Sequence, residues 1–223
     1  MFPLTSGVGK NMTIVNYEQL NISSVTGTGG FTAGGSICNV GIAANFPWLG
    51  SVSGNFAKFR FKFLRFIYVP RCPSTTPGSV YLYFSYDPKD IAPASLAQVA
   101  ASESSVIGNS WYGGPINPDS AFSKGLTLRD NIYLDVDCTR FTQPWYYVRA
   151  NDNATSNTVT LIGTATGGNG TLAINSGATY EYTARPGTIY YGSDGVTNGV
   201  VAGTIYMSYA VELYEPIAAA VNA

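Results

Sequence analysis

Apolar and polar residues alternate with a period of two over many short stretches of this chain. The clearest stretch, 203–215, places five apolar side chains on one face, namely Ile205, Met207, Tyr209, Val211 and Leu213. Residues 80–86 and 132–137 alternate in the same way, and further candidates are 12–25, 145–149, 158–166, 179–183 and 187–191. A period of two puts successive side chains on opposite faces of a strand. Many short strands separated by Gly, Pro and Asn turns predict an all-β antiparallel sandwich or barrel.

Helical periodicity is confined to two short stretches. Residues 93–100 begin with Pro93, and Leu96, Val99 and Ala100 follow at helical spacing. A second short turn is expected over 46–52. The Gly-rich segments 27–35 and 163–170 are typical of loops. No abrupt shift in composition divides the chain, so we expect a single domain.

The chain is polar without being charged. Charged residues make up 11% of the 223 positions, against roughly 25% in an ordinary soluble domain, and histidine is absent. Ser-His-Asp catalysis, Cys-His catalysis and imidazole metal sites are therefore excluded. The net charge of −1 makes the chain as a whole a poor binder of polyanions.

Cysteine usage and the start of the sequence indicate where such a chain resides. Cys38, Cys72 and Cys138 contain no C-x-x-C pair, so structural thiols in a reducing compartment are expected rather than disulfides or a thiolate metal cluster. The first residues lack the basic and apolar regions of a signal peptide, and no run of about 18 apolar residues occurs. We expect a soluble chain without a standard secretion signal or a membrane span.

Basic and aromatic residues alternate at the start of segment 58–90. Lys58, Arg60 and Lys62 would share one face of a strand, and Phe59, Phe61 and Phe63 the other. The pattern changes parity at Phe63-Leu64, which predicts a β-bulge. Because the phenylalanines face away from the basic residues, they are better explained as core than as a platform for stacking bases.

Landmarks in a fixed order carry a resemblance to a known family. The turn Tyr-Val-Pro-Arg-Cys-Pro at 68–73 joins two strands, and the other landmarks are Phe-Pro-Trp-Leu at 46–49, Asp-Pro-Lys-Asp at 87–90, Pro-Trp-Tyr at 144–146, Tyr-Tyr-Gly at 190–192 and Tyr-Ala-Val-Glu-Leu-Tyr-Glu-Pro at 209–216. In this order they resemble the shell domain of the coat proteins of small icosahedral plant RNA viruses, the tombusvirus and sobemovirus groups. The landmarks span most of the chain.

The resemblance implies an eight-stranded antiparallel jelly-roll sandwich with one or two short helices in its loops. Residues 1–45 would form an amino-terminal arm and the first strand, 46–216 the jelly-roll core, and 217–223 a carboxyl-terminal tail. The family further implies self-assembly into an icosahedral shell, T=3, of quasi-equivalent subunits. Its members usually carry a basic arm that neutralises packaged RNA, whereas only Lys10 precedes Lys58 here. We therefore expect a basic arm not represented in these residues, or an empty particle.

Asp87 and Asp90 flank Pro88-Lys89 directly after a predicted strand. Two carboxylates in one loop supply the oxygen ligands that calcium prefers, whereas the plainer interpretation is a turn in which Asp90 caps the following helix. The resemblance implies that Ca²⁺ at this D-x-x-D bridges neighbouring subunits, with Asn222 of the neighbour as a further ligand.

Two other sets of charged residues are candidate contacts. The basic row, which consists of Lys58, Arg60, Lys62, Arg65 and Arg71, would touch packaged nucleic acid or pair with carboxylates across subunit interfaces. Asp135 and Asp137 fall on one face of a predicted strand, about 7 Å apart. That pair fits glycoside hydrolysis in principle, but a solvent or interface role is the stronger interpretation.

Three functions from different classes compete: a viral coat subunit, a jelly-roll lectin or carbohydrate-binding module, and a sandwich hydrolase using Asp135 and Asp137. The order of the landmarks favours the coat protein, which is not an enzyme. Its expected partners are copies of itself and packaged single-stranded RNA, or DNA as in related coats of small DNA viruses, with no membrane. Its expected location is the virion, assembled in the host cytoplasm, or in the nucleus for a DNA virus.

Overall fold

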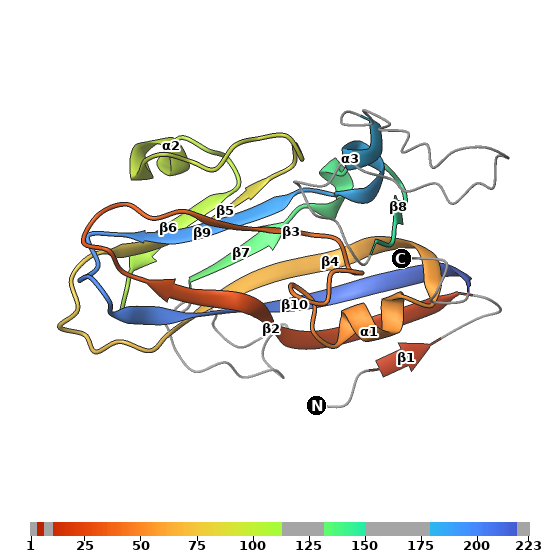
Figure 1. The fold of residues 1–223 in the computed structure, drawn as a ribbon, viewed down its shortest axis with the longest axis horizontal. Coiled ribbons are helices and arrows are strands. Elements are labelled where there is room, and N and C mark those ends of the chain that lie inside the picture. Colours follow the sequence, from red (N-terminus) through yellow and green to blue (C-terminus); the bar gives the residue numbers. More distant parts are fainter. Residues whose placement is uncertain (1–3, 7–10, 113–131, 150–178, 218–223) are drawn as a thin grey trace, which may run out of the picture.

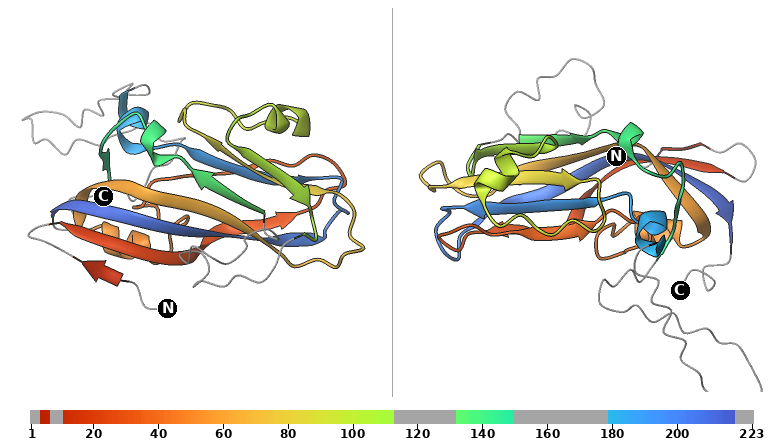
Figure 2. Two further views of the ribbon diagram at one scale, coloured as in Figure 1. Left: turned by 180° about the vertical axis from the view of Figure 1, so that it is seen from behind. Right: turned by 90° about the horizontal axis from the view of Figure 1, so that it is seen from above.

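The computed structural model describes residues 4–6, 11–112, 132–149 and 179–217. Antiparallel strands form two sheets that pack face to face (Figures 1 and 2). In the first sheet the order is β1 (Leu4–Ser6), β2 (Met12–Thr26), β10 (Val201–Pro216), β4 (Phe56–Pro70) and β7 (Ile132–Val136), and β8 (Tyr146–Tyr147) also pairs with β4. In the second it is β3 (Gly34–Ile37), β9 (Thr188–Asp194), β5 (Ser79–Ser85) and β6 (Ser105–Asn109).

Four strands in each sheet, β2-β10-β4-β7 and β3-β9-β5-β6, make the eight-stranded jelly roll that the sequence predicted, and the short β1 and β8 are additions to it. β10 lies in the middle of the first sheet, between β2 and β4. Its five predicted core side chains, Ile205 to Leu213 in alternation, are all fully buried. The period-two pattern therefore identified the core face of this strand correctly.

The predicted bulge lies in β4, with Lys62 as the extra residue. Ala210 of β10 is opposite Phe63, but Val211 is opposite Phe61, so Lys62 has no counterpart. Phe59 and Phe61 point into the core before the bulge, and Leu64 and Phe66 do so after it. Phe63 itself is only half-buried and was wrongly predicted as a core residue, because the parity changes at Lys62, before Phe63, and not after it.

Two short helices confirm the weak helical signals. These are α1 (Leu49–Ser53) and α2 (Leu96–Ala100). The side chain of Trp48 does not cap α1; instead, the carboxylate of Glu18 on β2 accepts the Trp48 N–H at 2.7 Å. The hydroxyl of Tyr209 on β10 donates to the same carboxylate at 2.6 Å, which fixes the helix against the first sheet.

Some elements differ from the predictions. Residues 179–183, predicted as a strand, belong to α3 (Thr179–Ala184), because a pattern of five residues does not separate strand from helix and tertiary contacts decide. Here the side-chain amide of Asn39 holds the carbonyl of Ala184 at 2.8 Å. The strand expected over 145–149 is reduced to β8, and the predicted loop over 27–35 ends where β3 begins. The predicted strand 158–166 and loop 163–170 lie outside the described residues.

The three thiols are free, and Cys38 is buried while Cys72 and Cys138 are half-buried. Burial raises the pKa of the Cys138 thiol to about 12 and that of Cys38 further, so both stay protonated near neutral pH. This agrees with a structural role. Within the described ranges, no helix is long and apolar enough to cross a membrane.

Candidate functional site

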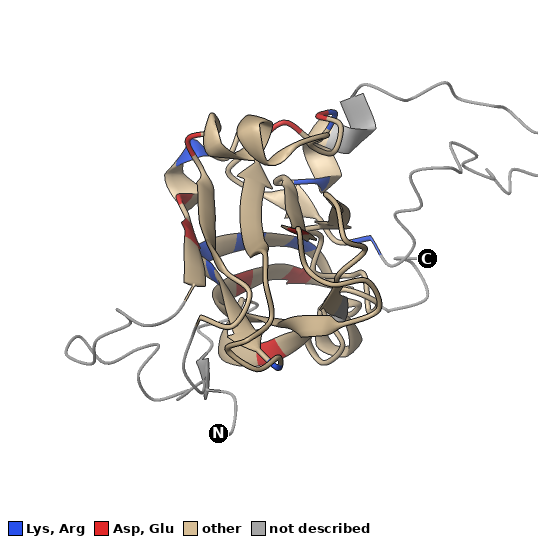
Figure 3. Cartoon of the chain, turned by 90° about the vertical axis from the view of Figure 1, so that its left-hand side faces the viewer, with Lys and Arg blue, Asp and Glu red and all other residues tan. Residues whose placement is uncertain are grey.

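Opposite charges meet across the outer face of the first sheet. We call this surface the charged row: Lys58, Arg60, Lys62 and Arg65 of β4, Glu212 and Glu215 of β10, and Asp135 of β7. Figure 3 shows basic and acidic positions on neighbouring strands. The strand register explains the pairing, because Glu212 is directly opposite Arg60, and Asp135 is directly opposite Arg65. Cross-strand neighbours of opposite charge stabilise a sheet.

Glu212 is the centre of the charged row. Its Oε2 lies 2.6 Å from Nη2 of Arg60 and 3.0 Å from Nζ of Lys62. Burial alone would raise the pKa of Glu212, but the hydrogen bonds and charges of Lys62 and Arg60 outweigh it and hold the pKa below its ordinary value of 4.5. Beside this group, Lys58 pairs with Glu215 at 3.1 Å, and the guanidinium of Arg60 lies 4.6 Å from the ring centre of Trp145.

Arg65 forms the other end of the charged row. Its Nε and Nη2 donate to the two carboxylate oxygens of Asp135, the second at 2.8 Å. The guanidinium also lies between two aromatic rings, 4.8 Å from the centre of Tyr133 and 5.4 Å from that of Phe63. Four of the five predicted basic contacts are thus paired within their own chain. Arg71 is separate from them, exposed at the end of β4, where its backbone N–H bonds to the carbonyl of Ala202.

Asp135 and Asp137 do not share a strand face, contrary to the prediction. β7 ends at Val136, and Asp137 instead begins a short 3-10 helix, Cys138–Arg140. Its Oδ1 accepts from the Thr139 hydroxyl at 2.6 Å and from the Thr139 N–H at 3.0 Å. These two hydrogen bonds lower the pKa of Asp137. Asp135 is bound to Arg65, so the two carboxylates are engaged separately.

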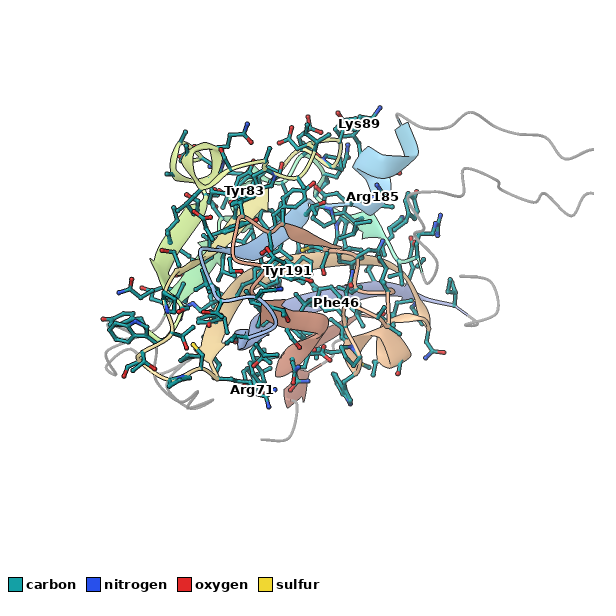
Figure 4. The ribbon with its side chains drawn as sticks, turned by 60° about the vertical axis from the view of Figure 1, so that its left-hand side comes forward. Phe46, Arg71, Tyr83, Lys89, Arg185 and Tyr191 are labelled. Atoms are coloured by element: carbon teal, nitrogen blue, oxygen red, sulfur yellow. The ribbon has the colours of Figure 1, made fainter. Side chains whose placement is uncertain are left out.

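The loop between β5 and α2 carries Asp87 and Asp90 and folds back on the second sheet. The hydroxyl of Ser85 donates to Oδ2 of Asp90 at 2.5 Å, and the hydroxyl of Tyr190 on β9 donates to the Asp90 carbonyl at 2.5 Å. Tyr190 stacks on Tyr83, and burial together with the nearby Asp90 and Tyr83 raises its pKa. In Figure 4, Lys89 of this loop and Arg71 lie on opposite sides of the molecule.

The Asp87–Asp90 loop has the hydrogen bonds of a turn. Oδ1 of Asp87 accepts the Lys89 N–H at 2.9 Å, which is ordinary turn chemistry, and also the Tyr182 hydroxyl at 3.3 Å. However, α2 is capped by Ser95, whose hydroxyl accepts the Gln98 N–H at 3.3 Å, so Asp90 is not the cap. The two carboxylates also line a pocket of about 270 Å³ together with Glu103 and Arg140.

The loop fits part of a calcium site. Calcium takes six to eight oxygen ligands, and Asp87 and Asp90 offer hard carboxylate oxygens from a single anchored loop. Across the described residues, no group of three or more His, Cys, Asp or Glu side chains is close enough to hold a metal ion. A complete site therefore needs ligands from elsewhere. Asn222, the predicted ligand from a neighbour, lies outside the described residues.

Two four-stranded antiparallel sheets in jelly-roll order define the class of double-sheet sandwiches that build viral shells and lectins. Comparison with protein families resolves which of these it is. The model described as "Viral coat protein (S domain)" matches residues 3–219, so the chain belongs to that family.

Individual relatives agree with the family. The chain is 27% identical to the capsid protein of Tobacco necrosis virus (strain A) over 227 residues, covering 99% of this chain and 71% of the relative. It is 27% identical to the capsid protein of Poinsettia latent virus over 179 residues, which is 78% of this chain but 53% of that protein. Among solved structures, Tobacco necrosis virus superposes with a TM-score of 0.77 at 27% identity, covering 100% of this chain and 90% of the other. Cocksfoot mottle virus shares the fold, with a TM-score of 0.72 at 20% identity over 99% and 91% of the two chains.

Membership in this family confirms the resemblance, the jelly-roll fold and the structural function read from the sequence. The chain is a viral shell protein and not an enzyme, so hydrolysis by Asp135 and Asp137 is excluded. As a coat protein it is part of the virion, and its partners are copies of itself.

The sequence analysis missed the acidic half of the charged row. Glu212 and Glu215 were assigned only to a strand, not to the basic residues that they bind. The signal was available in part, because two long alternating strands with opposite charges on their polar faces are candidates for neighbours. What the sequence lacked was the order of the strands.

Proposed function

We propose that copies of this chain associate through the edges and flanks of the sandwich into a closed icosahedral T=3 shell around a single-stranded nucleic acid. The match of the family model to residues 3–219 carries this proposal, because it covers both sheets of the sandwich. The similarity to capsid proteins supports it over nearly the whole chain.

The proposed cargo is RNA, or DNA as in related coats, and the proposed assembly site is the host cytoplasm, or the nucleus for a DNA genome. The basic row is a candidate contact for this cargo. The basic row has little positive charge left for the nucleic acid, because Lys58, Arg60, Lys62 and Arg65 already neutralise carboxylates of the same chain. With a net charge of −1, the 223 residues supply no excess of cations for the genome. We therefore assign neutralisation mainly to a basic arm beyond these residues.

We also propose that calcium bridges subunits at Asp87 and Asp90. Support comes from the anchored loop, in which Ser85 and Tyr190 fix the position of Asp90. Two carboxylates repel each other when they are close, and a cation removes that repulsion. The remaining ligands would come from a neighbouring subunit, with Asn222 as the candidate.

Electron microscopy of the purified chain tests the shell directly. The expected result is uniform hollow spheres of one size, or filled ones when single-stranded RNA is present. A chain that stays monomeric at high concentration and binds glycans on an array would contradict the shell and favour a carbohydrate-binding module. The array is the control for the lectin alternative, since both functions use jelly rolls.

A further inference from the structure

An exposed apolar surface lies at the end of β6, the outer strand of the second sheet. Ile107 is 37% exposed, and Trp111 and Tyr112, just past the strand, are each 39% exposed. The two aromatic rings contact each other edge to face, with centres 6.2 Å apart. Large apolar side chains gathered in this way are costly to leave in water and mark interaction sites.

The aromatic pair rests on a rigid base. Ser110, directly before Trp111, is fully buried, and its N–H donates to the Gly78 carbonyl at 3.1 Å. Its own carbonyl accepts from the Tyr68 hydroxyl at 2.6 Å and from the Cys72 thiol at 3.3 Å. The backbone that carries the two aromatic residues is thus anchored to the sandwich at Ser110. We call the exposed pair Trp111 and Tyr112 the aromatic knob.

A pocket of about 490 Å³ lies beside the knob. Its described lining consists of Val106, Ile107, Tyr112 and Ile132 together with small or polar neighbours, and none of these described residues is charged. Knob and pocket share Tyr112, so the same end of each molecule offers both a projection and a hollow of matching chemistry. The absence of charge from both disfavours nucleic acid, whose binding is dominated by phosphate contacts.

The edge of the second sheet points to the same kind of partner. β6 pairs with β5 on one side, and its residues Ser105–Asn109 contain no Lys, Arg or Pro. Proteins protect exposed apolar edge strands with such residues or cover the edge with another chain. In a protein whose partners are copies of itself, the available cover is a second copy.

We propose that the end of β6 is a contact surface between subunits, in which the aromatic knob of one copy enters the pocket of a second copy. The inference deepens the proposed function and rests on it. Trp111 is the expected anchor, because tryptophan at the centre of an interface contributes a large share of the binding energy.

Replacement of the anchor tests the energetic claim. The full chain with Trp111→Ala is expected to need an about thirtyfold higher protein concentration for particle assembly than the wild type. The control is Tyr214→Ala, because Tyr214 is similarly exposed, at 37%, but lies at the other end of β4. Tyr214 is opposite Lys58 at the start of β4, whereas the knob follows Ser110, which is bound by Tyr68 near the end of that strand. Equal thermal stability of the unassembled variants separates assembly from folding. Assembly of Trp111→Ala at the wild-type concentration would overturn the inference.

A fluorescence measurement tests the same contact without disrupting it. Trp48→Phe with Trp145→Phe leaves Trp111 as the sole tryptophan. Assembly is expected to shift its emission to shorter wavelength and remove most of its quenching by acrylamide. Unchanged quenching in intact particles would contradict the contact between knob and pocket without contradicting the shell.

If no particles form, the proposed shell is contradicted, but the contact between two copies can still be tested by sedimentation velocity. Small oligomers of the wild type that disappear in Trp111→Ala support it. Oligomers that persist in the variant, or a wild type that remains monomeric at all concentrations, contradict it.

Discussion

At the scale of single residues, Glu212 balances the charged row. One carboxylate oxygen, Oε2, receives both Arg60 and Lys62, and the side chain is 14% exposed. A group of three charges with a shielded centre is worth more than an isolated surface pair. The arrangement also explains why a basic strand and low net charge occur together, since the cations of β4 pair with carboxylates of β10 and β7.

Glu212→Gln is expected to lower the free energy of unfolding of the unassembled chain by about 1 kcal/mol at pH 7. Because the pKa of Glu212 is lowered in the folded state, its stabilisation is complete above pH 4.5 and is lost as the pH falls through the folded-state pKa. The difference in the free energy of unfolding between wild type and variant should therefore shrink as the pH falls from about 5 to about 3. Urea denaturation at each pH measures it.

Glu103→Gln provides the comparison for this prediction. Glu103 also forms an ion pair, at 3.1 Å to Arg140, but it is 82% exposed. Its replacement should change the stability at pH 7 by less than about 0.5 kcal/mol. Equal effects at the two positions would show that the shielded position of Glu212 adds nothing.

At the scale of elements, the bulge at Lys62 sets which side chains of β4 enter the core. Phe59 and Phe61 precede it, and Leu64 and Phe66 follow it with the opposite parity. The extra residue therefore lets one strand keep an apolar face toward the core along its entire length. Lys62 itself points outward and reaches Glu212.

Deletion of Lys62 is expected to prevent folding, because it would turn the buried residues on one side of the bulge toward solvent. Lys62→Ala keeps the residue count and loses only an exposed ion pair, so it should cost about 1 kcal/mol or less. Circular dichroism and thermal melting distinguish the two outcomes. A deletion variant that melts cooperatively near the wild-type temperature would refute this role of the bulge.

The sequence predicted those elements whose pattern is long. β10, β2 and β4 each extend over 15 or more residues, so period two is evident. β7 was predicted one residue too long, because Asp137 lies beyond its end at Val136. β6 was missed because Ser105–Asn109 is short and ends in Gly-Asn, as a turn would. For the candidate site, features within one strand were easier to predict than contacts between strands. Lys58, Arg60, Lys62 and Arg65 were correctly grouped on one strand, whereas Asp137 and Arg71 lie beyond the ends of their strands. The pairing of Arg60 with Glu212 depends on strand order, which a single sequence does not contain.

At the scale of the whole molecule, the calcium bridge that we propose at the Asp87–Asp90 loop would hold neighbouring subunits together, and its loss would loosen the shell. The loop is fixed to the sandwich through Ser85 and Tyr190, so changes at its carboxylates are not absorbed by loop movement. Without a cation, the two carboxylates of the loop repel each other when they are close, and the proposed link to the neighbouring subunit is lost.

Chelation of calcium at mildly alkaline pH is therefore expected to swell or dissociate particles, as seen in the hydrodynamic radius by light scattering. Asp87→Asn combined with Asp90→Asn should give particles that respond little to calcium. Asp194→Asn is the control, because Asp194 lies opposite Ser79, at the end of β9 away from the loop. An unchanged radius on chelation would contradict the calcium bridge, and calcium-dependent swelling that persists in the double variant would place it elsewhere.

The position of β10 also determines when the first sheet of a subunit can be completed during synthesis. β10 fills the centre of the first sheet, between β2 and β4, yet it is the last strand of the described chain to be made. At about 5–20 residues per second, roughly 10–35 seconds separate the synthesis of β2 from that of β10. Until then the first sheet has a gap that no earlier strand fills. Nascent chains held side by side on one messenger RNA therefore cannot present a finished first sheet to each other before β10 has been made.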